Sequence, residues 1–333
     1  MRFENTNIQI FYDTAKRLGI LVSVLRKNPP KIALHFGQQS HVIARKSMGL
    51  NSPKAIKLTR SKQKTQEVFK RNGLPILKHT IIYSIKGYQK ASKKISFPQV
   101  IKPTEGQKGK YVFLNVCSLK DGQKALKQLF TEFTSAIIEP YFKAPDYRFC
   151  VLGDRVIGLS ERIPPQITGD SKHNIRKLIE IENERRHKTN LKLGRRLLNR
   201  MRRWRRIRWY LESQGKSYSF IPKNGEKTTI YPLPNFTTGG SVRTINPKSI
   251  HPSFSKLAEK AAKTLSLTLC GVDILIKDLK KPASPQNCAV IEVNSDPGIR
   301  LHEWPNQGQP QPVASKILKF IAQKYQGKGG FKN

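Results

Sequence analysis

Hydrophobic residues along the chain follow two periods, one typical of helices and one typical of strands. Residues 7–18 carry apolar side chains at helical spacing, and Gly19 ends that pattern. Apolar runs that predict strands follow over residues 20–25, 32–36 and 41–44. These elements predict a small α/β unit at the N-terminus, over residues 1–58.

The pattern over residues 59–325 predicts a larger α+β domain. Helices are predicted over residues 61–72 and 118–133. Strands are predicted over residues 76–83, 97–103, 111–116, 136–139, 147–152, 155–161, 269–276 and 289–294. Residues 183–230 look like a basic helical insertion, with a helix over residues 195–211, and residues 326–333 form a tail.

Two apolar strands near the C-terminus carry polar side chains that suit a metal ion. The strand that ends at Asn294 also contains Glu292, and a period-two strand places both on one face. The strand over residues 269–276 contains Asp273. Carboxylate and amide oxygens are ligands of the kind that Mg²⁺ prefers, so the three residues predict a metal held against phosphate, with Arg300 beside it. We expect the two acids to repel each other without metal; core strands with incidental polar ends are the alternative.

A glycine-rich loop between two predicted strands has the composition of a phosphate cradle. Gly106 and Gly109 allow close backbone approach, and successive N–H groups in such a loop can bind an anion. Lys102, at the end of the preceding strand, would reach the phosphates. The loop lacks the Gly-Lys-Ser/Thr of the Walker pattern, and a flexible basic hairpin is the alternative.

A third segment suits a nucleotide. Residues 137–142 form an apolar run that contains Glu139, and Asp146 follows seven positions after that acid. Backbone groups of such a strand can hold adenine, and a carboxylate can hold ribose hydroxyls. An ordinary strand end is the alternative.

Charge is the most unusual property of the composition. The 333 residues include 62 Lys and Arg against 22 Asp and Glu, a formal net charge of +40. Charge of this size attracts polyanions and does not determine the fold. Non-specific binding to RNA, DNA or another polyanion through the basic surface therefore stays open, although an arginine-rich helix usually packs on its own protein.

Compartment and cysteine use point to a cytoplasmic protein. No apolar run approaches the roughly 18 residues that a membrane span needs. The N-terminus lacks the layout of a signal peptide. The cysteines lie far apart in apolar stretches, which predicts buried free thiols. These cysteines are Cys117, Cys150, Cys270 and Cys288.

Together, the order and spacing of these segments resemble the ATP-grasp superfamily of carboxylate–amine ligases over residues 59–325. Within it, the sequence is similar to the ATP-grasp modules of cyanophycin synthetases and bifunctional glutathione synthetases. The motifs that carry this likeness are residues 146–149, 161–165, 169–175, 183–186, 235–240 and 297–302. The resemblance implies an ATP-grasp fold, with two α+β lobes whose antiparallel sheets clasp ATP, after the small N-terminal unit.

The resemblance also implies a role for each candidate side chain. The implied ATP-binding residues are Lys62, Lys102, Glu105, Gly106, Gly109, Glu139, Tyr141, Phe142 and Asp146. The implied metal ligands are Asp273, Glu292 and Asn294, and the implied substrate-binding residues are Arg148, Arg162 and Arg300. Arg162 and Arg300 are the implied catalytic residues, because guanidinium groups suit a carboxylate and a developing acylphosphate. Residues 169–175 would close over the substrate, and His173 and His302 receive no role.

The reaction that the resemblance implies is ATP-dependent ligation of a carboxylate to an amine through an acylphosphate. It implies Mg²⁺ or Mn²⁺ and an amino acid or short peptide as substrate. Tyr111 stands where such lids often have another glycine, which leaves the mobility of the lid open. We also expect no second catalytic half, so the substrate's identity stays open. A homo-oligomer and an anionic acceptor are also compatible with the sequence. A basic nucleic-acid-binding protein on a repurposed ATP-grasp scaffold is the alternative.

Overall fold

The computed structural model mixes helices and strands along the chain, as predicted, and it forms two compact units. It describes residues 2–45, 47–105, 111–194, 197–201, 205–234 and 236–326, without the side chains of Arg205, Arg206 and Thr237. Unit 1 contains residues Met1–Ile76, Tyr147–Ser160 and Thr244–Asn333, and unit 2 contains residues Leu77–Asp146 and Glu161–Arg243.

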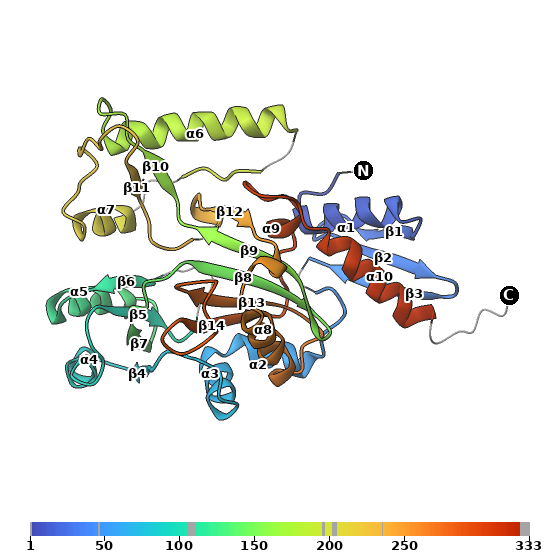
Figure 1. Ribbon diagram of the computed structural model, residues 1–333, viewed down its shortest axis with the longest axis horizontal. Coiled ribbons are helices and arrows are strands. Elements are labelled where there is room, and N and C mark those ends of the chain that lie inside the picture. Colours follow the sequence, from blue (N-terminus) through green and yellow to red (C-terminus); the bar gives the residue numbers. More distant parts are fainter. Residues whose placement is uncertain are drawn as a thin grey trace. The chain divides into compact units, whose positions relative to one another are not determined.

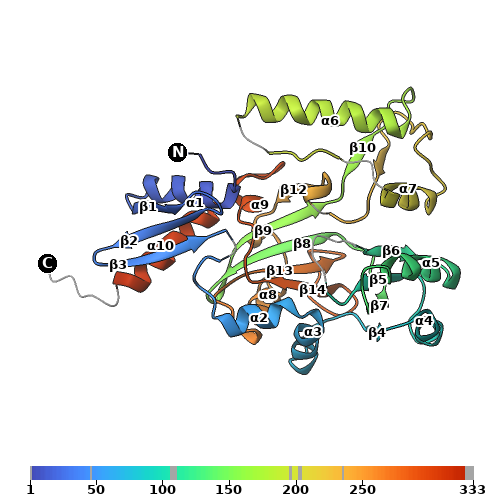
Figure 2. The same ribbon diagram turned by 180° about the vertical axis from the view of Figure 1, so that it is seen from behind.

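The N-terminal elements of unit 1 are those that the sequence predicted. They are helix α1 (Thr6–Arg17) and the antiparallel strands β1 (Leu21–Arg26), β2 (Lys31–Phe36) and β3 (Gln39–Ala44). The C-terminal helix α10 (Val313–Gln326) lies beside α1 and β2, and Phe11, Leu34 and Ile317 share one buried core (Figures 1 and 2). The first 58 residues therefore share a core with the end of the chain, and the predicted boundary at residue 58 stays a prediction.

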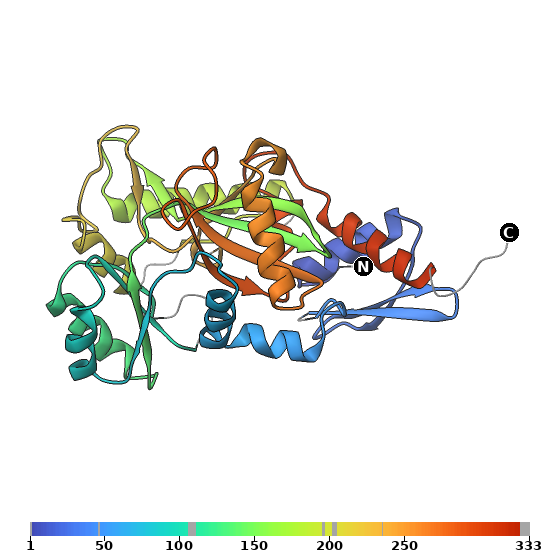
Figure 3. The same cartoon turned by 60° about the horizontal axis from the view of Figure 1, so that its bottom comes forward.

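A five-stranded sheet carries the predicted C-terminal strands. In spatial order its strands are β12 (Ser241–Thr244), β9 (Arg155–Ile163), β8 (Asp146–Leu152), β13 (Leu269–Ile276) and β14 (Cys288–Asn294). Helices α2 (Pro53–Arg60), α3 (Lys62–Arg71) and α8 (Ser253–Thr264) contribute to the core on one face of this sheet. In Figure 3, α8 lies across the strands, and Phe254 packs in the same core as Val272 and Val290.

One extra residue in β14 changes which side chains reach that core. Ile274 lies opposite Val290, whereas Asp273 lies opposite Glu292, so Ile291 is a bulge. A bulge shifts the alternation of side chains by one position. Val290 and Val293 therefore both enter the core beneath α8, and Glu292 points to the other face.

The first part of unit 2 is a four-stranded antiparallel sheet covered by two helices. Its strands, in spatial order, are β4 (Thr80–Ile82), β7 (Ala136–Pro140), β5 (Gln99–Pro103) and β6 (Phe113–Val116). The helices are α4 (Ile85–Ser92) and α5 (Leu119–Leu129) (Figure 1). Tyr88, Leu126, Ile101 and Ile138 belong to one core, so both helices cover the same face and leave the other face to Lys102 and its neighbours.

The remaining elements are short, except for one long helix in unit 2. They are β10 (Gln166–Thr168), β11 (Lys227–Thr229), helices α6 (Ile175–Lys192), α7 (Arg205–Glu212) and α9 (Arg300–Glu303), and 3₁₀ helices η1 (Phe236–Thr238) and η2 (Pro247–Ser249). Helix α6 runs through residue 183, and the predicted limits of the insertion stay a prediction. No helix in the described ranges is both long and apolar enough to cross a membrane.

The helix predicted over residues 195–211 is wrong in its first half. Helix α7 begins only at Arg205, and residues 197–201 have no helical structure. Residues 195–196 and 202–204 lie outside the described residues.

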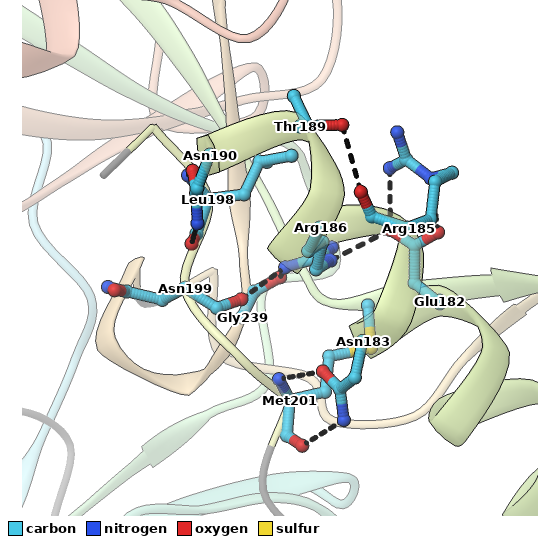
Figure 4. Close-up of polar contacts among 10 residues, drawn as sticks. All are labelled: Glu182, Asn183, Arg185, Arg186, Thr189, Asn190, Leu198, Asn199, Met201 and Gly239. Atoms are coloured by element: carbon cyan, nitrogen blue, oxygen red, sulfur yellow. Dashed lines mark hydrogen bonds and ion pairs between the residues drawn. The ribbon is translucent and has the colours of Figure 1, made fainter. Parts of the chain in front are cut away.

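Side chains of α6 explain this difference, because they take the backbone groups that a helix would need. Asn183 accepts from the N–H of Met201 at 2.7 Å and donates to its carbonyl at 2.8 Å. Asn190 likewise accepts from the N–H of Leu198 at 2.9 Å and donates to its carbonyl at 2.7 Å (Figure 4). Backbone groups that are satisfied by side chains gain nothing from a helical turn.

Arg186 links the same segment to the turn around Gly239. Its side chain is 5% exposed and donates to the carbonyls of Asn199 and Gly239, each at 2.7 Å (Figure 4). Its Nε binds Glu182 at 2.7 Å, and Arg185 binds the same carboxylate from the exposed side. The polar character of this face of α6 explains why hydrophobic periodicity did not reveal the helix.

Two smaller expectations are also corrected. The strand predicted over residues 76–83 is limited to Thr80–Ile82, the three residues that pair with β7. All four cysteines are free thiols, as predicted, but Cys117 is exposed, whereas the other three are buried.

Candidate functional site

The three predicted metal ligands lie on one face of the β13–β14 pair. Asp273 is directly opposite Glu292, and Gly271 is directly opposite Asn294. Opposed residues in an antiparallel pair share a face, as do residues two apart. Asp273 is 2% exposed, whereas Glu292 and Asn294 are only partly buried. Two carboxylates and an amide oxygen therefore converge, which is a donor set that fits Mg²⁺.

Arg148 on β8 neutralises the buried acid of this set. Its Nη2 donates to Oδ2 of Asp273 at 2.9 Å, and its Nε donates to Oδ1. Arg148 is 7% exposed, so the contact is a buried bidentate ion pair. The expectation that Asp273 and Glu292 repel each other without metal left out this cation, which offsets the charge of Asp273.

Gly271 makes room for the arginine. A Cβ at this position would lie 2.8 Å from both Cδ and Nη1 of Arg148, which is closer than carbon and nitrogen atoms tolerate. Glycine at this position lets Arg148 cross β13 to reach Asp273 without having to shift. The sequence analysis gave Gly271 no role; its place two residues before Asp273 in an apolar strand was the available signal.

Lys102 and Glu139 meet on the helix-free face of the four-stranded sheet. Lys102 Nζ lies 2.6 Å from Glu139 Oε1, and both side chains are almost fully buried, at 11% and 7% exposed. In the β5–β7 ladder Glu139 lies opposite Val100 and Lys102 lies opposite Ile137, so the two charged residues are diagonal neighbours. Such a buried lysine retains hydrogen-bond capacity, since its ammonium has three donors and this contact uses one.

Asp146 and Arg162 form a second ion pair within unit 2. Arg162 Nη2 lies 2.8 Å from both oxygens of Asp146, and its Nε lies 2.9 Å from Oδ1. The neighbouring Glu161 binds Arg243. Tyr141 follows β7, its N–H donates to the carbonyl of Pro98 at 2.8 Å, and burial raises the pKa of its phenol.

The other predicted residues occupy element ends. Lys62 is the first residue of α3, and Ser61 caps that helix. Arg300 is the first residue of α9 and is 8% exposed. Phe142 follows Tyr141, and Glu105 is exposed at the end of a described range. Gly106 and Gly109, with the predicted phosphate loop, lie outside the described residues.

A buried histidine of unit 1 was given no role by the sequence. Gln311 accepts from the N–H of Leu159 at 2.9 Å and donates to the carbonyl of Ile245 at 2.7 Å, which fixes its amide. Its Oε1 lies 3.3 Å from Nδ1 of His302, so that nitrogen carries the proton. Burial, with the positive charge of Arg148, lowers the pKa of His302 to about 3.

A common arrangement emerges from these contacts. Each predicted cation whose contacts are described above is paired with a predicted acid of its own unit: Lys102 with Glu139, Arg148 with Asp273, and Arg162 with Asp146. No cluster of three His, Cys, Asp or Glu side chains suits a metal within the described ranges; the predicted set has two carboxylates, and its third member is the amide of Asn294.

Comparison with known proteins gives these positions a family context. The family described as the RimK-like ATP-grasp domain matches residues 59–186 and 234–321. The chain belongs to the RimK-like ATP-grasp family. The prediction of an ATP-grasp relationship is confirmed, and Asp273, Glu292, Lys102 and Glu139 all lie in the matched ranges.

Individual relatives of this ATP-grasp chain are larger proteins. Cyanophycin synthetase of Crocosphaera subtropica is 30% identical over 274 residues, which are 80% of this chain and 31% of the relative. Glutathione biosynthesis bifunctional protein GshAB of Clostridium perfringens is 34% identical over 232 residues, which are 67% and 28%. The chain thus spans about a third of the length of these relatives.

Solved structures confirm the predicted fold class of the ATP-grasp chain. A bifunctional glutathione synthetase from Pasteurella multocida has a TM-score of 0.67 at 24% identity, over 96% of this chain and 43% of that chain. D-alanine–D-alanine ligase from Bacillus anthracis has a TM-score of 0.50 at 13% identity, over 84% and 72%. Both show the fold alone.

Proposed function

We propose that this chain is an ATP-dependent ligase that joins a carboxylate to an amine through an acylphosphate. The observation that carries the proposal is the register of β13 and β14, which gathers Asp273, Glu292 and Asn294 on one face. Family membership supports it, because the relatives are named as synthetases. The proposal extends to a cytoplasmic enzyme that acts on amino acids or short peptides.

The residues of the site have distinct tasks in this proposal. Asp273, Glu292 and Asn294 hold Mg²⁺, with Mn²⁺ as a substitute, and the bound ion supplies charge that neutralises phosphate oxygens. Lys62 and Lys102 bind the phosphates of ATP. Glu105, Gly106 and Gly109 belong to the loop that covers them, while Glu139, Tyr141, Phe142 and Asp146 hold the nucleoside.

The reaction then proceeds in two displacements. A carboxylate oxygen of the substrate attacks the γ-phosphorus of ATP, and the bond from that phosphorus to ADP breaks. The amine nitrogen next attacks the acyl carbon, the C–N bond forms, inorganic phosphate leaves, and the amine proton passes to solvent. Arg162 and Arg300, with Arg148, bind the carboxylate and the charge that develops on it. Positioning and charge neutralisation account for most of the catalysis of such a transfer.

The test is an ADP-release screen over pairs of carboxylates and amines drawn from amino acids and short peptides. Hydroxylamine added in place of the amine should trap the acylphosphate as a hydroxamate, which mass spectrometry identifies. Glu292→Gln is the matched control: it changes one proposed oxygen ligand, leaves the Arg148–Asp273 pair intact, and should lower ADP release. Absence of ADP release with every pair, in a folded protein that binds ATP, would refute the ligase proposal.

Nucleic-acid binding remains the second candidate because of the net charge of +40. Replacement of Arg202, Arg203, Arg205 and Arg206 by Gln should remove affinity for polyanions and leave ligation intact. Binding that rests on phosphate neutralisation falls steeply with salt, whereas reaction in a partly buried site is less screened. Tight, sequence-selective RNA binding without ATP turnover would favour the second candidate.

A further inference from the structure

Arg148 occupies the two oxygens of Asp273 that a metal ion would use. Its Nε and Nη2 each donate to a different carboxylate oxygen. The two side chains are 8% and 3% exposed, so water has little access to the pair. The resemblance implies that Arg148 binds substrate, but here its guanidinium faces the metal ligand instead.

A buried carboxylate needs a cation, and this one has a second acid beside it. Leaving Asp273 unpaired next to Glu292 would combine desolvation with like-charge repulsion. Arg148 prevents both. A divalent ion on the same oxygens would provide the same compensation with twice the charge, so the guanidinium and the ion are alternatives at Asp273.

The backbone is built for this contact. Gly271 leaves the space that Arg148 crosses, since a Cβ there would lie 2.8 Å from its Cδ and Nη1. Gly271 also lies opposite Asn294, so the arginine passes over the residue that is paired with the third predicted ligand. Glycine at position 271 is thus explained by the passage of Arg148 and not by a turn or a bulge.

We propose that Arg148 is a positioning residue that holds Asp273 while metal is absent, and that a divalent ion displaces its guanidinium from this carboxylate. The inference rests on the proposed metal site. Displacement frees a planar group with five donors on the same face of the sheet, where it is available to an anionic substrate. Substrate binding by Arg148 then depends on prior binding of the ion.

The test measures Mn²⁺ binding without nucleotide at pH 8, by electron paramagnetic resonance of the free ion. Arg148→Met keeps an unbranched apolar stem and removes the charged guanidinium. We expect it to bind Mn²⁺ about tenfold tighter than the wild type, roughly 1.4 kcal/mol. Affinity that is unchanged or weaker in this variant overturns the proposal.

Two further variants separate a local exchange from a general change of charge. Arg155→Met removes the same charge from the exposed pair with Asp154, whose side chains are 85% and 91% exposed, and should change affinity less than about twofold. Gly271→Ala keeps the charge but pushes Arg148 away from Asp273, and it should tighten Mn²⁺ binding as Arg148→Met does. An equal effect of Arg155→Met and Arg148→Met contradicts the exchange.

Asp273→Asn distinguishes failure of this inference from failure of the proposed function. Loss of Mn²⁺ binding in Asp273→Asn, with no gain in Arg148→Met, overturns only the exchange. Mn²⁺ binding that survives Asp273→Asn overturns the metal site itself. Should Arg148→Met be too unstable to purify, Arg148→Lys, which retains the charge but loses the bidentate contact, should still tighten Mn²⁺ binding.

Discussion

The stability of unit 1 should fall in mild acid because of one histidine. His302 is fully buried and donates from Nδ1 to a glutamine whose orientation is fixed by the backbone. Its pKa is lowered from 6.5 to about 3 by burial, with Arg148 and Lys316 contributing positive charge. The folded state thus binds this proton less readily than the unfolded state, so stability is lost as the pH falls below 6.5.

The size of the effect follows from the shift. Between the two pKa values, the unfolded state binds one more proton, and each pH unit costs about 1.4 kcal/mol. From about pH 7 to about pH 5, His302 alone should lower the free energy of unfolding by about 2 kcal/mol. His302→Gln cannot titrate but can still bond to Gln311, and it should lose that part of the pH dependence.

Urea unfolding followed by tryptophan fluorescence measures the difference. Trp304 packs against the core of unit 1, so a background in which Trp204 and Trp209 are replaced by Phe reports on that unit. The decisive quantity is the slope of the free energy against pH in His302→Gln compared with the parent, and not the absolute stability of either. Equal slopes would refute the assigned burial of a neutral imidazole.

Three further predictions concern the charged groups. Glu292→Gln should reduce turnover at least about a hundredfold with little change in the melting temperature, because it removes the negative charge of a proposed metal ligand and breaks none of the ion pairs described above; unchanged turnover would place the metal elsewhere. Lys102→Ala should weaken ATP binding by about tenfold to a hundredfold in calorimetry, the worth of a charge-assisted hydrogen bond; equal affinity would remove Lys102 from the phosphate site. Arg186→Met should lower the free energy of unfolding, measured by chemical denaturation, by roughly 2–4 kcal/mol. Arg185→Met should lower it by less than about 1 kcal/mol, because the side chain of Arg185 is 59% exposed although it binds the same Glu182. Equal losses in the two variants would contradict the role of the buried contacts.

Hydrophobic periodicity predicted the strands of the site because burial on one or both faces leaves a strong pattern. The runs that end at Asn294 and contain Asp273 are β14 and β13, whereas the pairing of these two strands and its register came from the structure. Helix α6 was missed for the opposite reason. Its contacts with residues 197–201 are made by asparagine and arginine side chains, which carry no apolar period.

Pairing between strands that are distant in sequence was beyond the sequence analysis. It named Arg148, Arg162 and Asp273 but treated each as a free ligand for substrate or metal. Arg148 lies 125 residues from Asp273 along the chain, and the local sequence pattern of neither strand indicates that these two residues pair. The role of Gly271 follows only from that pairing, since a glycine in a strand has several explanations.

The bulge at Ile291 determines which residues of β14 point to each face of the sheet. The core residues Cys288 and Val290 have even numbers, whereas Val293 has an odd one, so Glu292 lies on the face of Asp273 only because one residue has been added between Val290 and Val293. Point substitutions cannot undo this arrangement, but loss of a single residue there would turn the carboxylate toward the core beneath α8. Evolution of this strand is therefore constrained in length more tightly than in composition, and an alignment gap at this position would mark a relative whose acid points elsewhere.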